Sequence, residues 1–452
     1  MRSDPMQKRN EEVQTTRRDF IRTTGAVGAG LYLGGVANAA DSKPVKLESL
    51  ALNGGPQAIT HKVESATKWP LYGEEEIQAV VELLKAPNYE PVAEFEEAWK
   101  AYHGCPYAKA HCNGTSALTS MWFALNLPAG SEVLVADYST WFPVVPMRFF
   151  DLVPVFVDVD PRTMNISVED CKKRLSSKTR AIMPVHWWGL PCEMDEIENF
   201  AKEHDLVVVE DASHAHGARV KDKLIGNWGR IAGFSLQGTK PLPAIEGGIG
   251  MYKREDDFER ATTYGNYDLP KTFPEGSPYR KYQGTALGSK LRIHPASALL
   301  AKIQLSKLDD RNAAAREQMG RLNERLTQLP GLTCQYTRPD IERVYYFSNM
   351  MFIDETKAGM SRTAAVEALQ AEGADVKEYT WTLLHTYPAF LEQEWWRHMP
   401  VLPDPETLSG CHEANRTAIT LPYFTSDQPE LVEQYVQAFE KVWAHRDMVG
   451  KV

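Results

Sequence analysis

The chain has 452 residues, of which 43% are hydrophobic and 24% are charged, a composition typical of a soluble globular protein. This length allows two or three domains around a large core. The formal net charge of −10 argues against a nucleic-acid-binding scaffold and favours an enzyme that acts on small molecules or another acidic soluble protein. The six cysteines contain no Cys-x-x-Cys pair, which fits neither a zinc ribbon nor a dense disulfide framework, and we expect no metal site.

The N-terminus carries an export pattern. Thr16-Arg-Arg-Asp-Phe-Ile-Arg22 resembles a twin-arginine signal, an uncharged stretch over residues 23–36 follows, and Ala37-Asn38-Ala39 is a small-x-small cleavage pattern. The uncharged stretch is short and rich in glycine, so we expect no membrane-spanning helix and no stable membrane anchor. Residues 1–40 are therefore predicted to be a signal peptide that directs export to the periplasm. A basic tail on a cytoplasmic protein is the alternative.

Alternating helix and strand signals follow an extended lead-in over residues 41–68. Residues 73–85 have an acidic first turn and helical apolar spacing, which predicts a helix. Because short apolar runs alternate with helical stretches, the pattern indicates a mostly parallel sheet covered on both faces, an α/β fold. Ligands of such sheets bind beyond the carboxyl ends of the strands, where Asp211 and His186 lie. The predicted strands are residues 133–136, 154–159, 181–186, 206–210 and 231–235.

The C-terminal third predicts a smaller second domain. Residues 295–329 read as one long helix, interrupted if at all near Asp309-Asp310. Strand-like runs at 349–353 and 418–421 and a last helix over 429–445 complete this part. We therefore predict a large α/β domain over residues 41–294, followed by a connecting helix and a small domain over 295–452.

Two segments carry groups suited to catalysis. The first, residues 207–217, reads as a buried strand that ends in Asp211, with His214 three residues on. The second, residues 234–240, delivers the hydroxyl of Ser235 and the amine of Lys240. A carboxylate, a ring nitrogen, hydroxyls and one amine are the groups that a pyridoxal phosphate site needs. Taken alone, Lys240 has the alternative of a solvated lysine and Asp211 that of a capping or salt-bridged aspartate, and the nearby His216 fits a packed core histidine as well.

A phosphate site is predicted where residues 114–116 open the apolar helix 117–125. Free backbone N–H groups and the hydroxyls of Thr115 and Ser116 favour an anion at this helix N-terminus, although plain helix capping fits equally well. Trp141 follows a strand and is a candidate for stacking on a cofactor ring, with a core position as the alternative. Of Trp187 and Trp188, we expect one to line the pocket, since neighbouring side chains on an extended chain point apart.

Taken together, these segments resemble the DegT/DnrJ/EryC1/StrS aminotransferases, fold-type I pyridoxal phosphate enzymes that aminate keto-sugars and cyclitol ketones. The resemblance runs from about residue 54 to the C-terminal helix. Residues 183–189 and 214–217 are most similar to the branch of aminohydroxybenzoate synthases and inosose aminotransferases. The motifs that carry the resemblance are Asn113-Gly-Thr-Ser-Ala-Leu118, Pro154-Val-Phe-Val-Asp-Val-Asp160, Val209-Glu-Asp-Ala-Ser-His-Ala-His-Gly217, Phe234-Ser-x-x-x-Thr-Lys240 and Glu246-Gly247-Gly248.

The resemblance implies an aspartate aminotransferase-like fold, with a large α/β/α domain and a smaller C-terminal α+β domain. It makes Lys240 the Schiff-base lysine, Asp211 the partner of the pyridinium nitrogen and His214 the neighbour of the phenolic oxygen. Gly114, Thr115, Ser116 and Ser235 become the phosphate cradle, and Trp141 the stacking aromatic residue if one extra residue is allowed before it.

One position departs from the family pattern. Relatives carry an asparagine there that reaches the phosphate of the partner subunit, whereas this chain has Lys290. A lysine still offers that phosphate a point charge. The resemblance further implies a homodimer with the sites at its interface, glutamate or glutamine as amino donor, and a keto-sugar or cyclitol as acceptor.

Two other functions stay open at this point. One is a sugar dehydratase of the same fold, but relatives with that activity replace the lysine by histidine, so Lys240 argues against it. The other is a non-catalytic protein that binds pyridoxal phosphate or a sugar. The pair of Lys240 and Asp211 argues against that function, while Lys290 leaves it open.

Overall fold

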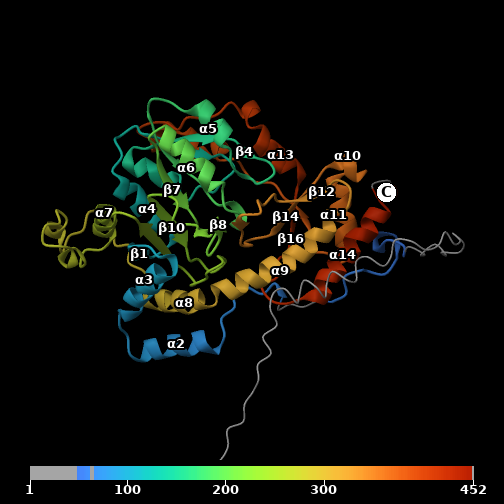
Figure 1. Ribbon diagram of the computed structural model, residues 1–452, viewed down its shortest axis with the longest axis horizontal. Coiled ribbons are helices and arrows are strands. Elements are labelled where there is room, and N and C mark those ends of the chain that lie inside the picture. Colours follow the sequence, from blue (N-terminus) through green and yellow to red (C-terminus); the bar gives the residue numbers. More distant parts are fainter. Residues whose placement is uncertain (1–47, 62–65, 450–452) are drawn as a thin grey trace, which may run out of the picture. The chain divides into compact units, whose positions relative to one another are not determined.

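The computed structural model describes residues 48–61 and 66–449, so the predicted signal peptide lies outside the described part of the chain. Among the residues described, no helix combines the length and the apolar character of a membrane span. Figure 1 shows two groups of strands, one around β7 and β10 and the other around β14 and β16, with helix α9 running beside the second group.

The larger sheet has seven strands in the order β1-β11-β10-β7-β6-β2-β3. Strands β10, β7, β6, β2 and β3 run parallel, and β11 is antiparallel to both of its neighbours, β10 and β1. The expectation of a mostly parallel α/β sheet is therefore confirmed. The strands are β1 (Tyr107–His111), β2 (Glu132–Ala136), β3 (Val153–Val157), β6 (Thr179–Met183), β7 (Val207–Asp211), β10 (Ile231–Ser235) and β11 (Gly248–Tyr252).

Helices pack on this sheet and bury its apolar runs. Helix α4 packs on β10 and β11, α3 on β1, α6 on β7 and α5 on β3. The predicted helix at residues 73–85 is confirmed as α2, which packs on α8. These helices are α2 (Glu74–Lys85), α3 (Glu90–His103), α4 (Gly114–Leu125), α5 (Val168–Arg174), α6 (Met194–Glu203), α7 (Glu255–Gly265) and α8 (Pro295–Ser306).

The smaller sheet is antiparallel, with four strands in the order β12-β14-β16-β15. Strands β14 and β16 match the runs predicted from the sequence. The sheet consists of β12 (Leu332–Cys334), β14 (Asn349–Ile353), β15 (Lys377–Glu378) and β16 (Ala418–Leu421), and its main helices are α9 (Leu308–Leu326), α11 (Arg362–Ala371) and α14 (Pro429–Ala444). Shorter elements are β4 (Val159–Asp160), β5 (Asn165–Ile166), β8 (Arg219–Val220), β9 (Lys223–Leu224), β13 (Ile341–Glu342), α10 (Glu355–Ala358), α12 (Pro388–Leu391) and α13 (Ser409–Thr417).

The predicted long helix is two helices, α8 and α9, which meet at Lys307. The amine of Lys307 bonds Glu75 at 2.7 Å and Glu76 at 2.6 Å, and thereby ties the junction to the start of α2. Helix α8 packs on α3 beside the large sheet, while α9 packs on α14. The division of the chain at residue 294 stays a prediction.

The end of β7 sends two carboxylates to opposite faces of the sheet, because side chains alternate along a strand. Glu210 accepts backbone N–H bonds from Gly226 and Trp228 at 2.9 Å and from Gly229 at 2.6 Å. The Cys192 N–H donates to His186 Nδ1, which leaves the His186 Nε2–H to donate to Glu210 at 3.2 Å. Burial alone would raise the pKa of Glu210, but these hydrogen bonds outweigh burial and lower the pKa. Glu210 is thus fully bonded within the fold, and Asp211 points the other way.

Candidate active site

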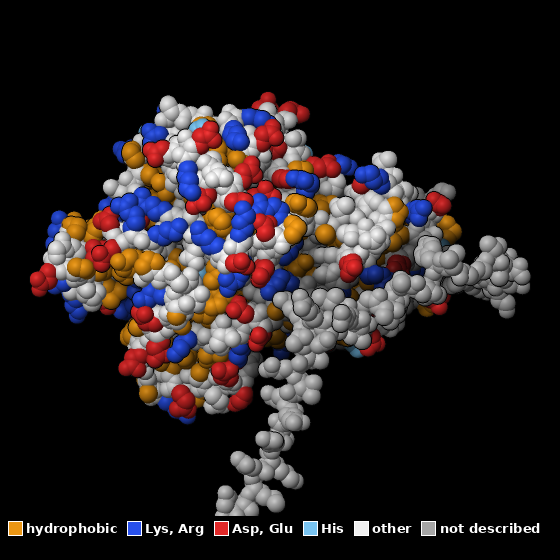
Figure 2. Space-filling model, viewed as in Figure 1, with side chains coloured by type: hydrophobic (Ala, Val, Ile, Leu, Met, Phe, Trp, Pro, Cys, Tyr) orange, Lys and Arg blue, Asp and Glu red, His pale blue; other side chains and the backbone are white. Residues whose placement is uncertain are grey.

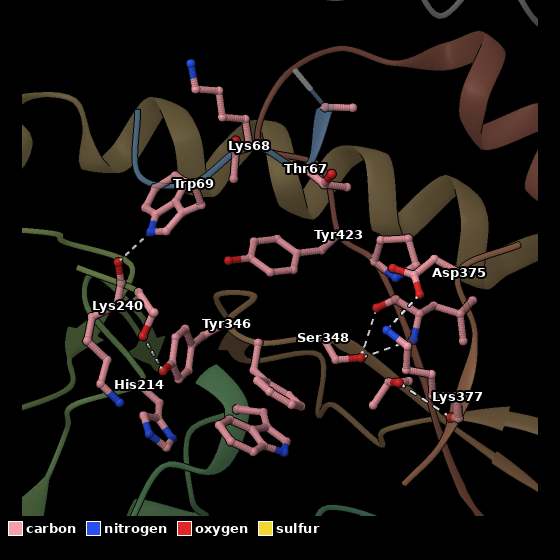
Figure 3. A pocket seen from close by; sticks show the side chains of 18 of the residues that line it. Thr67, Lys68, Trp69, His214, Lys240, Tyr346, Ser348, Asp375, Lys377 and Tyr423 are labelled. Atoms are coloured by element: carbon pink, nitrogen blue, oxygen red, sulfur yellow. Dashed lines mark hydrogen bonds and ion pairs between the residues drawn. The ribbon is translucent and has the colours of Figure 1, made fainter. Parts of the chain in front are cut away.

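A cavity of about 650 Å³ lies beyond the carboxyl ends of β7 and β10 (Figure 3), within the size range of small-molecule sites. His214 and Lys240 line one side, and residues 66–69 lie over it. The opposite side comes from the smaller sheet and its loops, with Ser348, Asp375, Lys377 and Tyr423 among the residues.

Lys240 is half-buried in a turn just after β10. Its Nζ lies 4.5 Å from the centroid of the Tyr346 ring, and Figure 3 shows the amine directed toward His214. The indole N–H of Trp69 donates to the Lys240 carbonyl at 3.1 Å and anchors the turn to the lead-in segment. Within residues 48–61 and 66–449, no carboxylate forms an ion pair with this amine. The amine is therefore available to react with a carbonyl or to carry a proton.

Asp211 is only 3% exposed at the end of β7. Burial raises the pKa of its carboxyl, while hydrogen bonding to Ser213 and the charge of Lys240 act in the opposite direction. The Ser213 N–H donates to Oδ1 at 3.1 Å, and the described part of the chain provides no ion pair for this carboxylate. A buried carboxylate is costly without a cationic partner. Asp211 therefore fits a protonated ring nitrogen of a bound ligand.

His214 is held between aromatic rings. Its imidazole stacks on Trp188, with centroids 4.9 Å apart and planes at 16°, and its centroid lies 4.7 Å from that of Tyr346. Burial and the nearby charge of Lys240 hold the pKa of His214 well below its ordinary value, so the ring is neutral. The buried Nδ1 has no hydrogen-bond partner among the described residues. An unpaired buried nitrogen at this place fits a polar atom of a bound ligand.

Ser235 and the start of α4 meet at the other end of the site. A Cβ on Gly114 would lie 2.6 Å from the Ser235 Cβ, so glycine is needed for this approach. The Asn113 side chain accepts the Ser116 N–H at 2.8 Å, which leaves the N–H groups of Gly114 and Thr115 without partners inside the helix. Together with the helix dipole, these groups suit an anion, and phosphate binding at this place stays a prediction.

Of the predicted cofactor ligands, His214 and Lys240 line the main cavity, whereas Thr115 and Ser116 line a separate recess and Trp141 and Lys290 line neither. Trp141 is 43% exposed and packs on Phe142, with ring centroids 4.0 Å apart, and it is Phe142 that lines the cavity. Lys290 is exposed on the segment after α7, with its amine 6.0 Å from the centroid of the Tyr267 ring. Stacking by Trp141 and phosphate binding by Lys290 stay predictions.

The aromatic wall of the cavity was predicted only in part: the expectation that one tryptophan of the Trp187-Trp188 pair lines the pocket is confirmed, but the tyrosines of the wall were not predicted. The Tyr346 hydroxyl lies 3.1 Å from Thr239 Oγ1, and its ring contacts both His214 and Lys240. Trp188, not Trp187, lines the cavity, and its indole N–H donates to the Tyr379 hydroxyl at 3.2 Å. Tyr346 and Tyr379 come from segments more than 100 residues beyond Lys240 that carry no motif, so no local signal marks them.

A sequence profile of the DegT/DnrJ/EryC1/StrS aminotransferase family matches residues 70–439. The chain belongs to this family. It is 28% identical over 384 residues to the spore coat polysaccharide biosynthesis protein SpsC of Bacillus subtilis, covering 82% of this chain and 95% of that protein. It is also 29% identical to the putative L-glutamine:3-amino-2,3-dideoxy-scyllo-inosose aminotransferase of Streptoalloteichus tenebrarius, covering 73% of this chain and 80% of the relative.

Solved structures agree with this family assignment. A 3-amino-5-hydroxybenzoic acid synthase superposes with a TM-score of 0.70 at 25% identity and covers 83% of this chain and 98% of its own. A GDP-4-keto-6-deoxymannose-3-dehydratase shares the fold, with a TM-score of 0.72 at 20% identity over 82% of this chain and 100% of its own. The protein is thus a fold-type I, pyridoxal phosphate-dependent aminotransferase of the DegT/DnrJ/EryC1/StrS family.

The residues of this aminotransferase fit pyridoxal phosphate. The unpaired Lys240 amine suits the cofactor aldehyde, and the buried Asp211 carboxylate suits its ring nitrogen. The unpartnered His214 Nδ1 is a candidate partner for the ring oxygen. Ser235 and the first turn of α4 suit the phosphate.

Replacing Gly114 tests the phosphate site. In Gly114→Ala the new methyl group would clash with Ser235, so α4 must shift away from β10 and the phosphate should lose aligned N–H donors. We expect the dissociation constant for pyridoxal phosphate, measured by equilibrium dialysis, to rise about tenfold or more. Gly320→Ala is the matched control, since a methyl group there meets nothing within 4 Å. Unchanged affinity in Gly114→Ala would contradict the assignment.

Proposed function

We propose that the protein transfers an amino group from glutamate or glutamine to the ketone of a sugar or cyclitol. The observation that carries this proposal is the unpaired Lys240 amine, which lies in a pocket for a small molecule beside the buried Asp211 and His214. The similarity to the putative L-glutamine:3-amino-2,3-dideoxy-scyllo-inosose aminotransferase of Streptoalloteichus tenebrarius supports both the glutamine donor and the cyclitol acceptor.

Asp211 and Lys240 have separate tasks in this proposal. Bound pyridoxal phosphate supplies an electron sink for charge that develops on the substrate carbon. Asp211, held at the end of β7, keeps a positive charge on the ring nitrogen. Lys240 carries the proton to and from the substrate carbon once its amine is free.

The aromatic wall supports the same chemistry. Trp188 and Tyr346 hold the neutral His214 ring in place from two sides. Their side chains cover the inner end of the cavity and reduce the access of water to the reacting atoms. His214 is thereby oriented as a hydrogen-bonding partner of the cofactor and not as a second base, because its pKa is held low.

Dehydration of a sugar is the second candidate, since a dehydratase shares the fold. Lys240 favours transamination over this candidate. A lysine can bind the cofactor covalently and be displaced by an amino donor.

Removal of the Lys240 amine tests the proposal. Wild-type protein loaded with pyridoxal phosphate should show the visible absorbance band of a lysine-bound cofactor, and Lys240→Ala should lose it. Glutamate or glutamine should convert the wild-type cofactor to its amine form, detected as loss of that band, and Lys240→Ala should show no catalytic turnover. Lys202→Ala, which removes an exposed lysine on α6, should behave as wild type. A loaded wild-type protein that responds to neither donor would contradict this proposal and favour the cofactor-binding alternative.

We further propose that two copies of the chain form the complete enzyme. Phe149 is 60% exposed and lines a recess with Thr115, Ser116 and Tyr264, next to the phosphate site. In Figure 2, hydrophobic side chains gather at the left of the view, over α7 and the segment that follows it. Exposed apolar surface next to a binding site is typical of a protein interface.

The mass of the particle in solution tests the dimer. Light scattering after size exclusion should give twice the chain mass for the wild type. Phe149→Glu places a charge in the proposed interface and should shift the protein toward a monomer with weaker cofactor binding. Leu391→Glu alters a similarly exposed residue on α12, 49% exposed, and should remain dimeric. A monomeric, cofactor-saturated wild type would contradict the proposal.

We also propose export through the twin-arginine route, with removal of residues 1–40. The order of paired arginines, an uncharged stretch and a small-x-small site supports it. Cell fractionation with mass determination should find the shortened chain in the periplasm. Replacing both Arg17 and Arg18 by lysine should retain the full chain in the cytoplasm, and an unchanged location of this variant would contradict the proposal.

A further inference from the structure

A second cavity, of about 890 Å³, is lined by residues of α9, β12 and β14 and by Pro161 and Arg162. Figure 1 shows these three elements close together in the smaller part of the described chain. This cavity shares no lining residue with the candidate active site. The proposed amino transfer makes no use of it.

Arg343, between β13 and β14, is a buried cation on the wall of this cavity, 5% exposed. Its Nη2–H donates to the Trp188 carbonyl at 3.3 Å and its Nε–H to the Val344 carbonyl at 3.4 Å. Its guanidinium carbon lies 4.3 Å from the centroid of the Tyr345 ring. Among the described residues, Nη1 has no hydrogen-bond acceptor and no carboxylate lies within ion-pair distance.

Most other cations on the same wall do have acidic partners. Arg162 pairs with Asp160 at 2.6 Å, Lys357 with Asp354 at 3.0 Å, and Arg416 with Glu413 at 2.8 Å. These pairs are exposed, whereas Arg343 is buried with only two carbonyls and an aromatic ring around it. Burial lowers the pKa of Arg343, but a guanidinium stays charged at any physiological pH. A charge in such a place is unfavourable unless an anion neutralises it.

The same wall holds a buried acceptor that also lacks a partner. Gln335 is 1% exposed and its amide N–H donates to the Thr163 carbonyl at 2.6 Å. Its Oε1 has no donor among the described residues. Arg316, another cation of the lining, pairs with Glu342 at 3.7 Å. The lining thus includes a buried guanidinium whose Nη1 has no acceptor and a buried amide oxygen that has no donor among the described residues.

We propose that this second cavity is a binding site for an oxyanion, a carboxylate or phosphate group, whose oxygens accept hydrogen bonds from Arg343. The planar fork of a guanidinium matches two oxygens of either group. A hydroxyl on the same ligand, or the proton of a phosphate, would satisfy Gln335. A purely structural Arg343 would predict no response to such anions.

Binding is tested on full-length protein loaded with pyridoxal phosphate, so that the phosphate site on α4 is filled. Inorganic phosphate and acetate are titrated separately by calorimetry, with chloride at matched ionic strength as reference. We expect saturable heat from at least one of the two oxyanions, which also assigns the ligand class. Arg343→Met should weaken that binding about tenfold or more, because hydrogen bonds to a charged group are lost. No saturable binding of either anion to the wild type would overturn the proposal.

Thermal unfolding of Arg343→Met and of one further variant separates binding from folding. Arg343→Met should unfold at the same or a higher temperature in chloride, since it removes an uncompensated buried charge, and it should lose the rise in unfolding temperature that the oxyanion gives the wild type. Arg325→Met, which removes an exposed arginine of α9, should keep the full rise. An equal oxyanion-dependent rise in both variants would overturn the proposal.

A third measurement uses the wild-type protein and so does not depend on a variant that folds. Cys334 is half-buried on the wall of the cavity, while Cys105 is half-buried elsewhere. The bound oxyanion should slow the alkylation of Cys334 by maleimide severalfold and leave the alkylation rate of Cys105 unchanged. Mass spectrometry measures both rates. Equal rates at Cys334 with and without saturating oxyanion would overturn the proposal.

Discussion

The candidate active site depends on two adjacent buried carboxylates at the end of β7, Glu210 and Asp211, which have different hydrogen-bond partners. Strand alternation turns Glu210 to one face, where three backbone N–H groups and His186 satisfy it completely. Asp211 turns to the other face, where the described residues offer it one backbone donor and the distant charge of Lys240. The first carboxylate stabilises the loop after β9, and the second is left with capacity to bind a cationic ligand. A shift of one residue in strand register would exchange these roles and remove the site.

The sequence was sufficient for the elements that hold the catalytic groups. β7 and β10 are short, apolar runs flanked by breakers, and α4 is an apolar helix behind a capping asparagine, so local signals and tertiary structure agree. β1 and β11 were missed for a physical reason. Gly248 and Gly250 give β11 little strand preference, and β1 contains Ala108 and Ala110, so both strands depend on pairing with partners far along the chain.

The cavity itself could not be derived in the same way. Lys240, Asp211 and His214 lie in recognisable motifs, but Tyr346 and Tyr379 reach the site through loops whose course depends on the smaller sheet. The same limit applies to Trp141, because an aromatic residue after a strand predicts a position near the site and not the direction of its ring. Motifs therefore indicated the candidate reacting groups, and long-range packing supplied the surfaces that surround them.

The backbone of Trp188 has φ of +49°, in the left-handed region that favours glycine and costs a large side chain of the order of 1–3 kcal/mol. Gly189 follows with φ of +84°, so the turn is already made at a residue that tolerates it. A glycine at position 188 would relieve the local strain, yet the residue there is tryptophan, which has the largest side chain of all residue types. The free energy stored in this turn is offset by the indole's contacts with His214, Tyr379 and Phe347. The strained turn therefore gives Trp188 contacts on two sides. Its indole stacks on His214 at the candidate active site, and its carbonyl accepts a hydrogen bond from the buried Arg343.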